Sequence, residues 1–195
     1  TAAADGLTTG VIEQIPYKEN LELAASLYPD ADRIVAITDD SISGLGEIKE
    51  FQNLAESYTD FRFEELNASL YSKKEFAAEL EKFDKHTIVI FLICSEDKDG
   101  NAYTNREVEE MIKEHANVQI FRVVQEGVGN GFFGGAVVSF EDAGQLAGEM
   151  AMKILEGTEP SEIAMVESST NLYYFDEEVV NRYHIIKTQL PKKAE

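Results

Sequence analysis

Hydrophobic positions along the chain follow two alternating spacings. Short apolar segments, typical of buried strands, are separated by segments in which apolar residues recur every three or four positions, as on one face of a helix. The strand-like segments are 33–38, 61–66, 87–94, 118–124 and 136–140, followed by two weaker ones at 163–166 and 172–175. The helical segments are 20–28, 48–58, 73–83, 108–112, 142–155 and 177–183. This alternation predicts an α/β fold in which a doubly wound, mainly parallel sheet lies between two layers of helices.

Segment 87–94 has the pattern of a central strand, because it is apolar on both faces. In doubly wound sheets, ligands bind beyond the carboxyl ends of the strands. The loops that follow the predicted strands are therefore the places to search for a site. These loops are 38–46, 66–71, 95–103 and 124–135.

The net charge of the chain is −20. A surface this acidic repels phosphate backbones and anionic lipid head groups, so we expect neither a nucleic-acid partner nor peripheral membrane binding. The longest apolar run, 88–94, is far shorter than the roughly 20 residues of a transmembrane helix, and residues 1–5 show no signal-peptide pattern. Cys94, the only cysteine, ends this run, which predicts a core role and permits no intramolecular disulfide.

Asp39 and Asp40 directly follow the strand-like segment 33–38. Two adjacent carboxylates could bind a divalent metal or a cationic ligand group, and the segment also looks like the opening of a phospho-receiver domain that holds magnesium. A receiver needs a lysine after its fifth strand, whereas residues 123–126 read Val-Val-Gln-Glu. One of the two aspartates could instead cap the following helix. A ligand-binding role, a receiver and a helix cap are all retained as alternatives.

The loop after the central strand begins with Ser95 and Glu96. Asp97 and the two polar side chains at 99 and 101 have the alternate spacing of a calcium loop, but the glycine comes fourth and a valine stands twelfth. An EF-hand is therefore excluded. A solvated Asp-Gly turn is one interpretation of this loop. Ser95 and Glu96 are expected ligand contacts because they leave the end of a central strand.

Residues 129–134 match the dinucleotide-binding pattern G-x-G-x-x-G. That pattern must open a helix after the first strand, whereas this stretch leads into the strand-like segment 136–140, so a nucleotide site is not expected. The glycines could let the backbone approach a ligand or a hinge, with Phe132 and Phe133 stacking on the ligand. A glycine-rich turn with both phenylalanines in the core is the alternative.

No set of residues predicts catalysis. The three histidines lie at element edges, and the sequence has no nucleophile elbow, phosphate-binding Walker loop, H-E-x-x-H motif or paired C-x-x-C motif. We therefore expect the protein not to be an enzyme, and we expect neither a cofactor nor a bound metal.

Several pieces of the chain, taken in order, resemble one family. They are 9–13, the helix 21–27 followed by Tyr28-Pro29, 38–40 with Ser43-Gly44, the turn 97–100, the glycines and phenylalanines of 131–135, and 147–157. The family is the ABC-transporter substrate-binding-protein-like domain, which has type I periplasmic-binding-protein architecture. The resemblance implies Rossmann-like lobes that are joined by a hinge and close on a small molecule.

The resemblance also implies a division of the chain and a set of site residues. Residues 10–124 resemble the second lobe, residues 125–195 resemble the hinge, helix and C-terminal tail of the first lobe, and the upstream half of that first lobe would precede residue 10. The cleft-facing candidates that it implies are Glu13, Asp39, Asp40, Ser43, Ser95, Glu96, Asp97 and the turn 131–134 with Gly131, Phe132 and Phe133.

The C-terminal segments 174–176, 182–185 and 189–191 look more like sensor versions of this family, which serve bacterial histidine kinases and diguanylate cyclases. The leading hypothesis is thus an extracytoplasmic domain, in the periplasm or at the outer membrane face, that senses an amino acid or similar small molecule for a membrane-embedded signalling partner. The substrate-binding component of an ABC transporter is the alternative, and a receiver or flavodoxin-like domain is the second alternative. A homodimer is compatible with the resemblance.

Overall fold

The main body of the protein is a six-stranded sheet with the strand order β3-β2-β4-β5-β6-β8. The computed structural model describes residues 7–55, 57–168 and 171–195. The strands are β2 (Arg33–Thr38), β3 (Arg62–Asn67), β4 (Thr87–Phe91), β5 (Ile120–Arg122), β6 (Gly134–Val138) and β8 (Asn171–Phe175). Neighbouring strands are parallel except β6 and β8, which are antiparallel. The predicted mainly parallel α/β sheet, with 87–91 in its interior, is confirmed.

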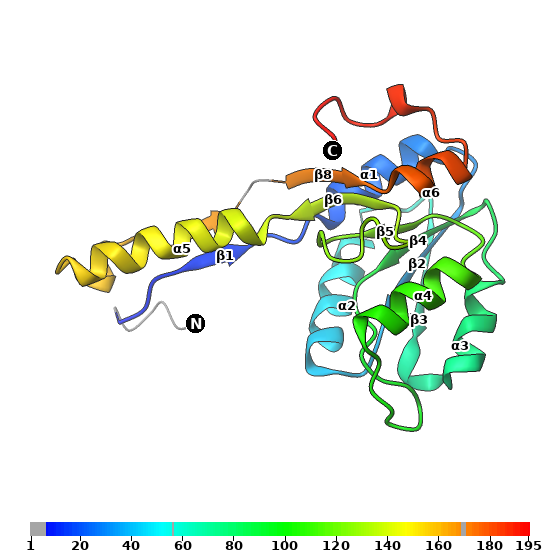
Figure 1. Ribbon diagram of the computed structural model, residues 1–195, viewed down its shortest axis with the longest axis horizontal. Coiled ribbons are helices and arrows are strands. Elements are labelled where there is room, and N and C mark those ends of the chain that lie inside the picture. The colour runs from blue at the N-terminus through cyan, green and yellow to red at the C-terminus, as the bar shows by residue number, and fades with distance from the viewer. Residues whose placement is uncertain (1–6, 56, 169–170) are drawn as a thin grey trace.

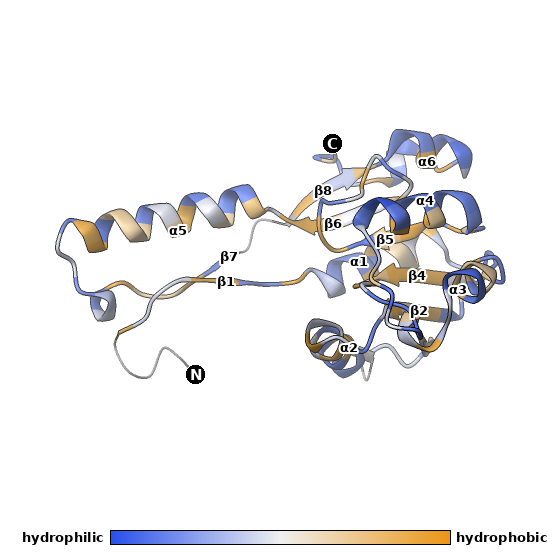
Figure 2. Cartoon of the chain, turned by 60° about the horizontal axis from the view of Figure 1, so that its bottom comes forward, coloured by the Kyte–Doolittle hydropathy of each residue, from blue (hydrophilic) through white to orange (hydrophobic). Residues whose placement is uncertain are grey.

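Helices cover both faces of this sheet (Figure 1). They are α1 (Tyr17–Leu27), α2 (Ile42–Ala55), α3 (Lys73–Leu80), α4 (Asn105–His115) and α6 (Glu177–Arg182). Val35 and Ile37 of β2 pack in a core with α3 and α4, whereas Ile34 and Ala36 pack on the other face with α1, α2 and α6. β4 is buried along its whole length and has the colour of hydrophobic residues in Figure 2. The body is therefore a three-layer α/β/α unit.

A second, smaller unit extends away from the six-stranded sheet (Figure 1). It consists of the parallel strands β1 (Val11–Glu13) and β7 (Val166–Ser168), with the long helix α5 (Phe140–Leu155) against β1. The chain passes between the two units after β1, after β6 and after β7. Segment 125–195, expected to return to the first lobe, therefore also contributes β6, β8 and α6 to the main body.

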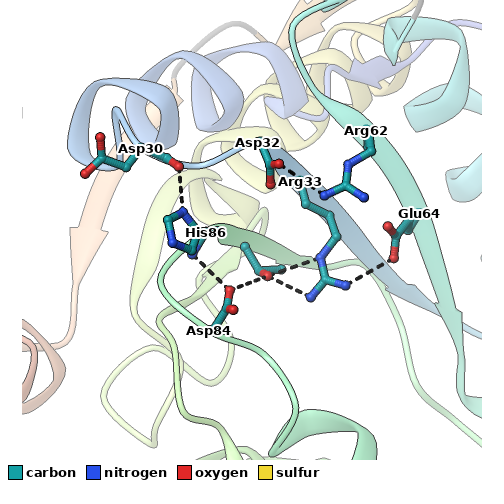
Figure 3. Close-up of polar contacts among 8 residues, drawn as sticks. Asp30, Asp32, Arg33, Arg62, Glu64, Asp84 and His86 are labelled. Atoms are coloured by element: carbon teal, nitrogen blue, oxygen red, sulfur yellow. Dashed lines mark hydrogen bonds and ion pairs between the residues drawn. The ribbon is translucent and has the colours of Figure 1, made fainter.

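Polar contacts hold the amino edge of the sheet together (Figure 3). Arg33 Nη2 donates a hydrogen bond to Thr87 Oγ1 at 2.8 Å. Arg33 Nη1 lies 3.4 Å from the Glu64 carboxylate. Arg62 pairs with Asp32 at 3.1 Å. These contacts cross between β2, β3 and β4 at the edge opposite the loops that were expected to carry a site, so this edge serves stability.

One buried amide fastens two of the connections between the units. Asn20 of α1 is fully buried, and its Nδ2 donates to the carbonyls of Pro16, at 2.9 Å, and Ala136, at 2.7 Å. Its Oδ1 accepts from the backbone N–H of Ala136 at 2.9 Å. A Cβ at Gly135 would lie 2.0 Å from Asn20 Oδ1, which explains the glycine at that position. Asn20 thus ties the segment before α1 to β6.

Replacing Asn20 with alanine should lower the free energy of unfolding by about 3 kcal/mol, because it leaves the buried N–H and carbonyl of Ala136 without their side-chain partner. The Pro16 carbonyl keeps the hydrogen bond from the backbone N–H of residue 20. The exposed Asn53 of α2 supplies the control, since Asn53→Ala removes no buried contact and should leave stability within about 0.5 kcal/mol. Urea unfolding followed by circular dichroism measures both. Equal stabilities for the two variants would show that the Asn20 amide does not fasten the connections.

Candidate ligand-binding cavity

A cavity of about 330 Å³ opens at the carboxyl edge of the main sheet, where β4 and β5 end. This volume lies in the range of small-molecule sites. Ile15 in its wall belongs to the connection after β1, and Phe140 is the first residue of α5 in the smaller unit, so the cavity lies at the junction of the two units. The residues that line this Arg122 cavity are Ile15, Glu47, Phe91, Leu92, Ile93, Cys94, Ser95, Tyr103, Asn105, Val108, Glu109, Arg122, Val123, Val124, Glu126, Gly127, Phe132 and Phe140.

Arg122, the last residue of β5, brings a mostly buried cation into this wall. Its guanidinium carbon lies 4.7 Å from the ring centre of Phe91 and 5.2 Å from that of Phe132. Nη1 donates to the carbonyl of Leu92 at 3.1 Å, and Nε donates to the carbonyl of Glu126 at 3.0 Å. Burial lowers the pKa of Arg122 to about 10, so the group remains charged at neutral pH.

Three carboxylates line the same cavity: those of Glu47, Glu109 and Glu126. Burial raises the pKa of Glu47, and the nearby charge of Arg122 opposes that rise. The Glu126 carboxylate accepts a hydrogen bond from Asn105 Nδ2 at 2.5 Å. The cavity wall therefore holds three carboxyl groups beside one guanidinium.

Asp39 and Ser95, both expected at the site, contact each other. The buried Asp39 carboxylate accepts hydrogen bonds from the N–H of Ser95 at 2.6 Å and from the Ser95 hydroxyl. It also accepts from the N–H of Ser41 at 3.0 Å and the Ser41 hydroxyl at 2.5 Å. Burial would raise the pKa of Asp39, but these hydrogen bonds outweigh it and lower the pKa. Asp39 therefore joins the ends of β2 and β4, and Ser95 extends from this joint into the cavity wall.

The other expected residues of the first loops lie outside the cavity wall. Asp40 is exposed and accepts from Asn67 Nδ2 at 2.7 Å, and Ser43 is exposed on the first turn of α2. Glu96 is exposed, whereas the Asp97 carboxylate is buried and accepts from the backbone N–H of Asn101 at 2.9 Å. These side chains shape the loops around the cavity.

The remaining expected residues lie in three places. Glu13 is exposed on β1 of the smaller unit. Phe132 is buried in the cavity wall, whereas Phe133 is buried in the core on the α1 side of the sheet. The N–H of Gly131 points to Asp176 Oδ2 at 3.4 Å. The two phenylalanines are thus core residues, and only Phe132 also borders the cavity.

The sequence reasoning missed Arg122 and Glu47. Arg122 did carry a signal, because it is the only charged residue in the apolar segment 118–124, and a charge inside a buried strand is uncommon. Glu47 carried none, since a glutamate on an amphipathic helix normally faces solvent.

A doubly wound unit with a ligand-sized cavity at its carboxyl edge, joined to a second α/β unit beside that cavity, has the architecture of a periplasmic-binding-protein-like domain. The model of the family described as ABC transporter substrate binding protein matches residues 2–190. The chain belongs to this family, whose members bind substrates and are of a non-catalytic type. The assignment replaces the receiver and flavodoxin-like alternatives.

Solved structures show the same fold at low sequence identity. An ABC domain in complex with L-Trp from Streptococcus pneumonia has a TM-score of 0.68 and 20% identity, over 95% of this chain and 63% of that one. A ligand-free, open substrate binding protein with adhesive properties from Clostridium difficile has a TM-score of 0.65 and 17% identity, over 94% of this chain and 59% of that one. A conserved domain protein from Vibrio cholerae has a TM-score of 0.69 and 18% identity, over 94% of this chain and 59% of that one.

This chain therefore spans about 59–63% of the length of these three structures. A search of curated proteins gives no match. Within the residues that the structure describes, no helix is long and apolar enough to cross a membrane.

Asp39→Asn should lower the free energy of unfolding by about 2–4 kcal/mol at pH 7, because an amide cannot accept all four hydrogen bonds. The pKa of Asp39 is lower in the folded chain than in the unfolded chain, where it is about 3.9. The ionised carboxylate therefore stabilises the folded chain fully above this pH, and the stabilisation is lost as the pH falls through the pKa of the folded chain. The variant should therefore lose less stability than the wild type on acidification. Urea midpoints from pH 7 to pH 2 test this, with the exposed Asp60→Asn as control; identical pH profiles for the two variants would contradict it.

Cys94 should react slowly with thiol reagents while the chain is folded. Burial and the charge of Asp39 raise its pKa to about 12, which leaves little thiolate at pH 8. We expect the native thiol to react with Ellman's reagent at least about a hundredfold more slowly than the thiol in urea-unfolded chain. Similar rates in the two states would mean that the Cys94 side of the cavity opens readily to solvent.

Proposed function

We propose that this chain forms the main ligand-binding lobe of a protein that captures a small molecule outside the cytoplasmic membrane. The observation that carries this proposal is the position of the Arg122 cavity, between the carboxyl edge of the sheet and the connections at Ile15 and Phe140. A ligand held there would contact both the lobe and its hinge. Differential affinity for the closed arrangement would then couple ligand binding to a change in the angle between the units.

The smaller unit is proposed to belong to the opposing lobe. Large hydrophobic side chains on α5 and just before β7 are exposed: Met152 is 55% exposed, Leu155 80% and Met165 38%. A two-stranded sheet with one helix is too small to form an independent core. Further chain that covers these side chains would complete a two-lobed protein, in keeping with the greater length of the three similar structures.

Binding, and not catalysis, is the proposed role of the cavity. Its serine, Ser95, donates its hydroxyl hydrogen bond to Asp39, whose lowered pKa makes that carboxylate a weak base. Its thiol, Cys94, has a raised pKa and is a weak nucleophile at neutral pH. These properties suit a wall that holds a ligand without reacting with it.

Substrate delivery to a membrane transporter is the function that the family match favours. Sensing for a membrane-embedded signalling protein is the second candidate, favoured by the C-terminal sequence pattern at 174–176 and 182–185. The two differ in the coding sequence beyond residue 195. A transmembrane segment followed by a kinase or cyclase domain would establish sensing, whereas a stop codon soon after this tail would establish transport.

Thermal unfolding against amino acids, nucleobases, short peptides and divalent cations tests ligand binding. A specific ligand at a hundred times its Kd should stabilise the folded chain by about 2.7 kcal/mol. The measurement is made on this chain and on the full protein that its gene encodes. Arg62→Gln, at the amino edge, supplies the control and should keep the same ligand response. Absence of stabilisation by any compound in both proteins would overturn the proposal.

A further inference from the structure

Asn130 and Gly131 are the only Asn-Gly pair in the sequence, and they lie in the turn before β6. Asparagine is a thermally labile residue, because the backbone nitrogen of the next residue can attack its side-chain amide. Glycine in that next position leaves the nitrogen accessible, since it has no Cβ. Asn130 is also exposed to water. This pair is therefore the least hindered place in the chain for such an attack.

The Asn130 side chain is free to turn toward that nitrogen. Within the residues that the structure describes, its amide forms no hydrogen bond. The side chains of Asn67, Asn101 and Asn105, in contrast, each donate to a carboxylate. The residue that follows each of these three also carries a Cβ. The fold thus restrains these asparagines and leaves Asn130 unrestrained.

The Gly131 nitrogen is held only weakly. Its N–H points to Asp176 Oδ2 at 3.4 Å, which is longer than the roughly 2.7–3.2 Å of ordinary N–H···O bonds. The fold also requires glycine here, because φ is +113° and a Cβ would lie 2.9 Å from the Cβ of Lys113. A side chain at this position that blocked the attack would strain the turn, so the reactive pair is built into the fold.

We propose that Asn130 is a self-modification site, at which the Gly131 nitrogen attacks the side-chain carbon Cγ and the asparagine becomes aspartate or isoaspartate. The N–Cγ bond forms and the Cγ–Nδ2 bond breaks. The amide proton of Gly131 passes to hydroxide, and the nitrogen of the side chain leaves as ammonia with a proton from water.

Water then opens the cyclic imide that this step produces. Breaking the bond from nitrogen to Cγ gives aspartate, whereas breaking the bond from nitrogen to the backbone carbonyl carbon gives isoaspartate. The reaction needs only water and hydroxide, and it does not depend on the proposed function.

The consequence of isoaspartate reaches the Arg122 cavity through Phe132. Isoaspartate carries the chain through its side chain, which adds one carbon to the backbone just before Gly131. The turn is closed by a bridge between Val128 and Phe132, so the extra carbon is absorbed beside Phe132. The ring of Phe132 is buried and lies 5.2 Å from the guanidinium carbon of Arg122. The modification should therefore displace part of the cavity wall.

Incubation of the wild-type chain at pH 8 and about 37 °C, followed by proteolysis and mass spectrometry, tests the reaction. Each modified peptide gains about one dalton, and electron-transfer fragmentation distinguishes isoaspartate from aspartate. The internal controls are Asn53, which is exposed but followed by leucine, and Asn101, which is held by a carboxylate. We expect Asn130 to be modified at least about tenfold faster than either, more slowly at pH 6, and with isoaspartate among the products.

The same incubation of guanidinium-unfolded chain shows what the sequence does without the fold. A rate at Asn130 in the folded chain within about tenfold of the rate in the unfolded chain is the expected result. Modification in the unfolded chain alone would overturn the proposal, because the folded turn would then prevent the attack. Equal rates at Asn130, Asn53 and Asn101 in the folded chain would overturn it as well.

Two variants separate the added charge from the added carbon. Asn130→Gln stays neutral and cyclises more slowly, because its ring would be one atom larger, and freshly prepared Asn130→Asp supplies the charge with a normal backbone. Backbone amide spectra of ¹⁵N-labelled chains are recorded before and after incubation. New signals for Arg122 and Phe132 should appear in the incubated wild type and in neither variant. Unchanged signals for both residues in modified wild-type chain would overturn the link to the cavity.

Discussion

The buried guanidinium of Arg122 holds the ligand side of the structure together. It joins the end of β4, through the carbonyl of Leu92, to the loop after β5, through the carbonyl of Glu126. The ring of Phe132 stacks beside it, which brings the glycine-rich turn before β6 into the same wall. The loop after β4 and both ends of the connection from β5 to β6 thus meet at one cation.

The parallel sheet explains why the chemistry gathers at one edge. Since β2, β4 and β5 run in the same direction, the residues that follow them converge, and the Asp39–Ser95 contact forms between two such ends. The amino edge, held by Arg33, Thr87 and their neighbours, has the opposite character and serves stability (Figure 3). The cavity and the anchoring contacts therefore lie at opposite edges of the sheet, and the cavity wall includes Ile15 and Phe140, at two of the passages between the units.

Periodicity predicted the strands of the main sheet and the helices, but not β1. The rule that ligands bind beyond the carboxyl ends of the strands indicated the edge of the sheet that carries the cavity. Ser72 and Thr104 both form capping boxes, a motif that depends on residues only three apart and is therefore visible in the sequence. Long-range contacts could not be predicted in this way. The strand expected at 163–166 is instead β7 from Val166 onward, since its partner is β1, more than a hundred residues earlier. Asp39 and Ser95 were both named, but their mutual hydrogen bonds were not foreseen.

The most direct test of the account is where a ligand binds on this chain. Backbone amide shifts of ¹⁵N-labelled protein would be recorded while L-tryptophan is added to millimolar concentration. The account predicts that the largest shifts fall on residues 92–95, 103–109 and 122–127, around the Arg122 cavity. A second groove lies between α3 and α4 and is lined by Lys73, Ala77 and Met111, among others. Shifts centred on that groove, or on the C-terminal tail near Leu190, would contradict this prediction, because the ligand would then bind away from the carboxyl edge of the sheet.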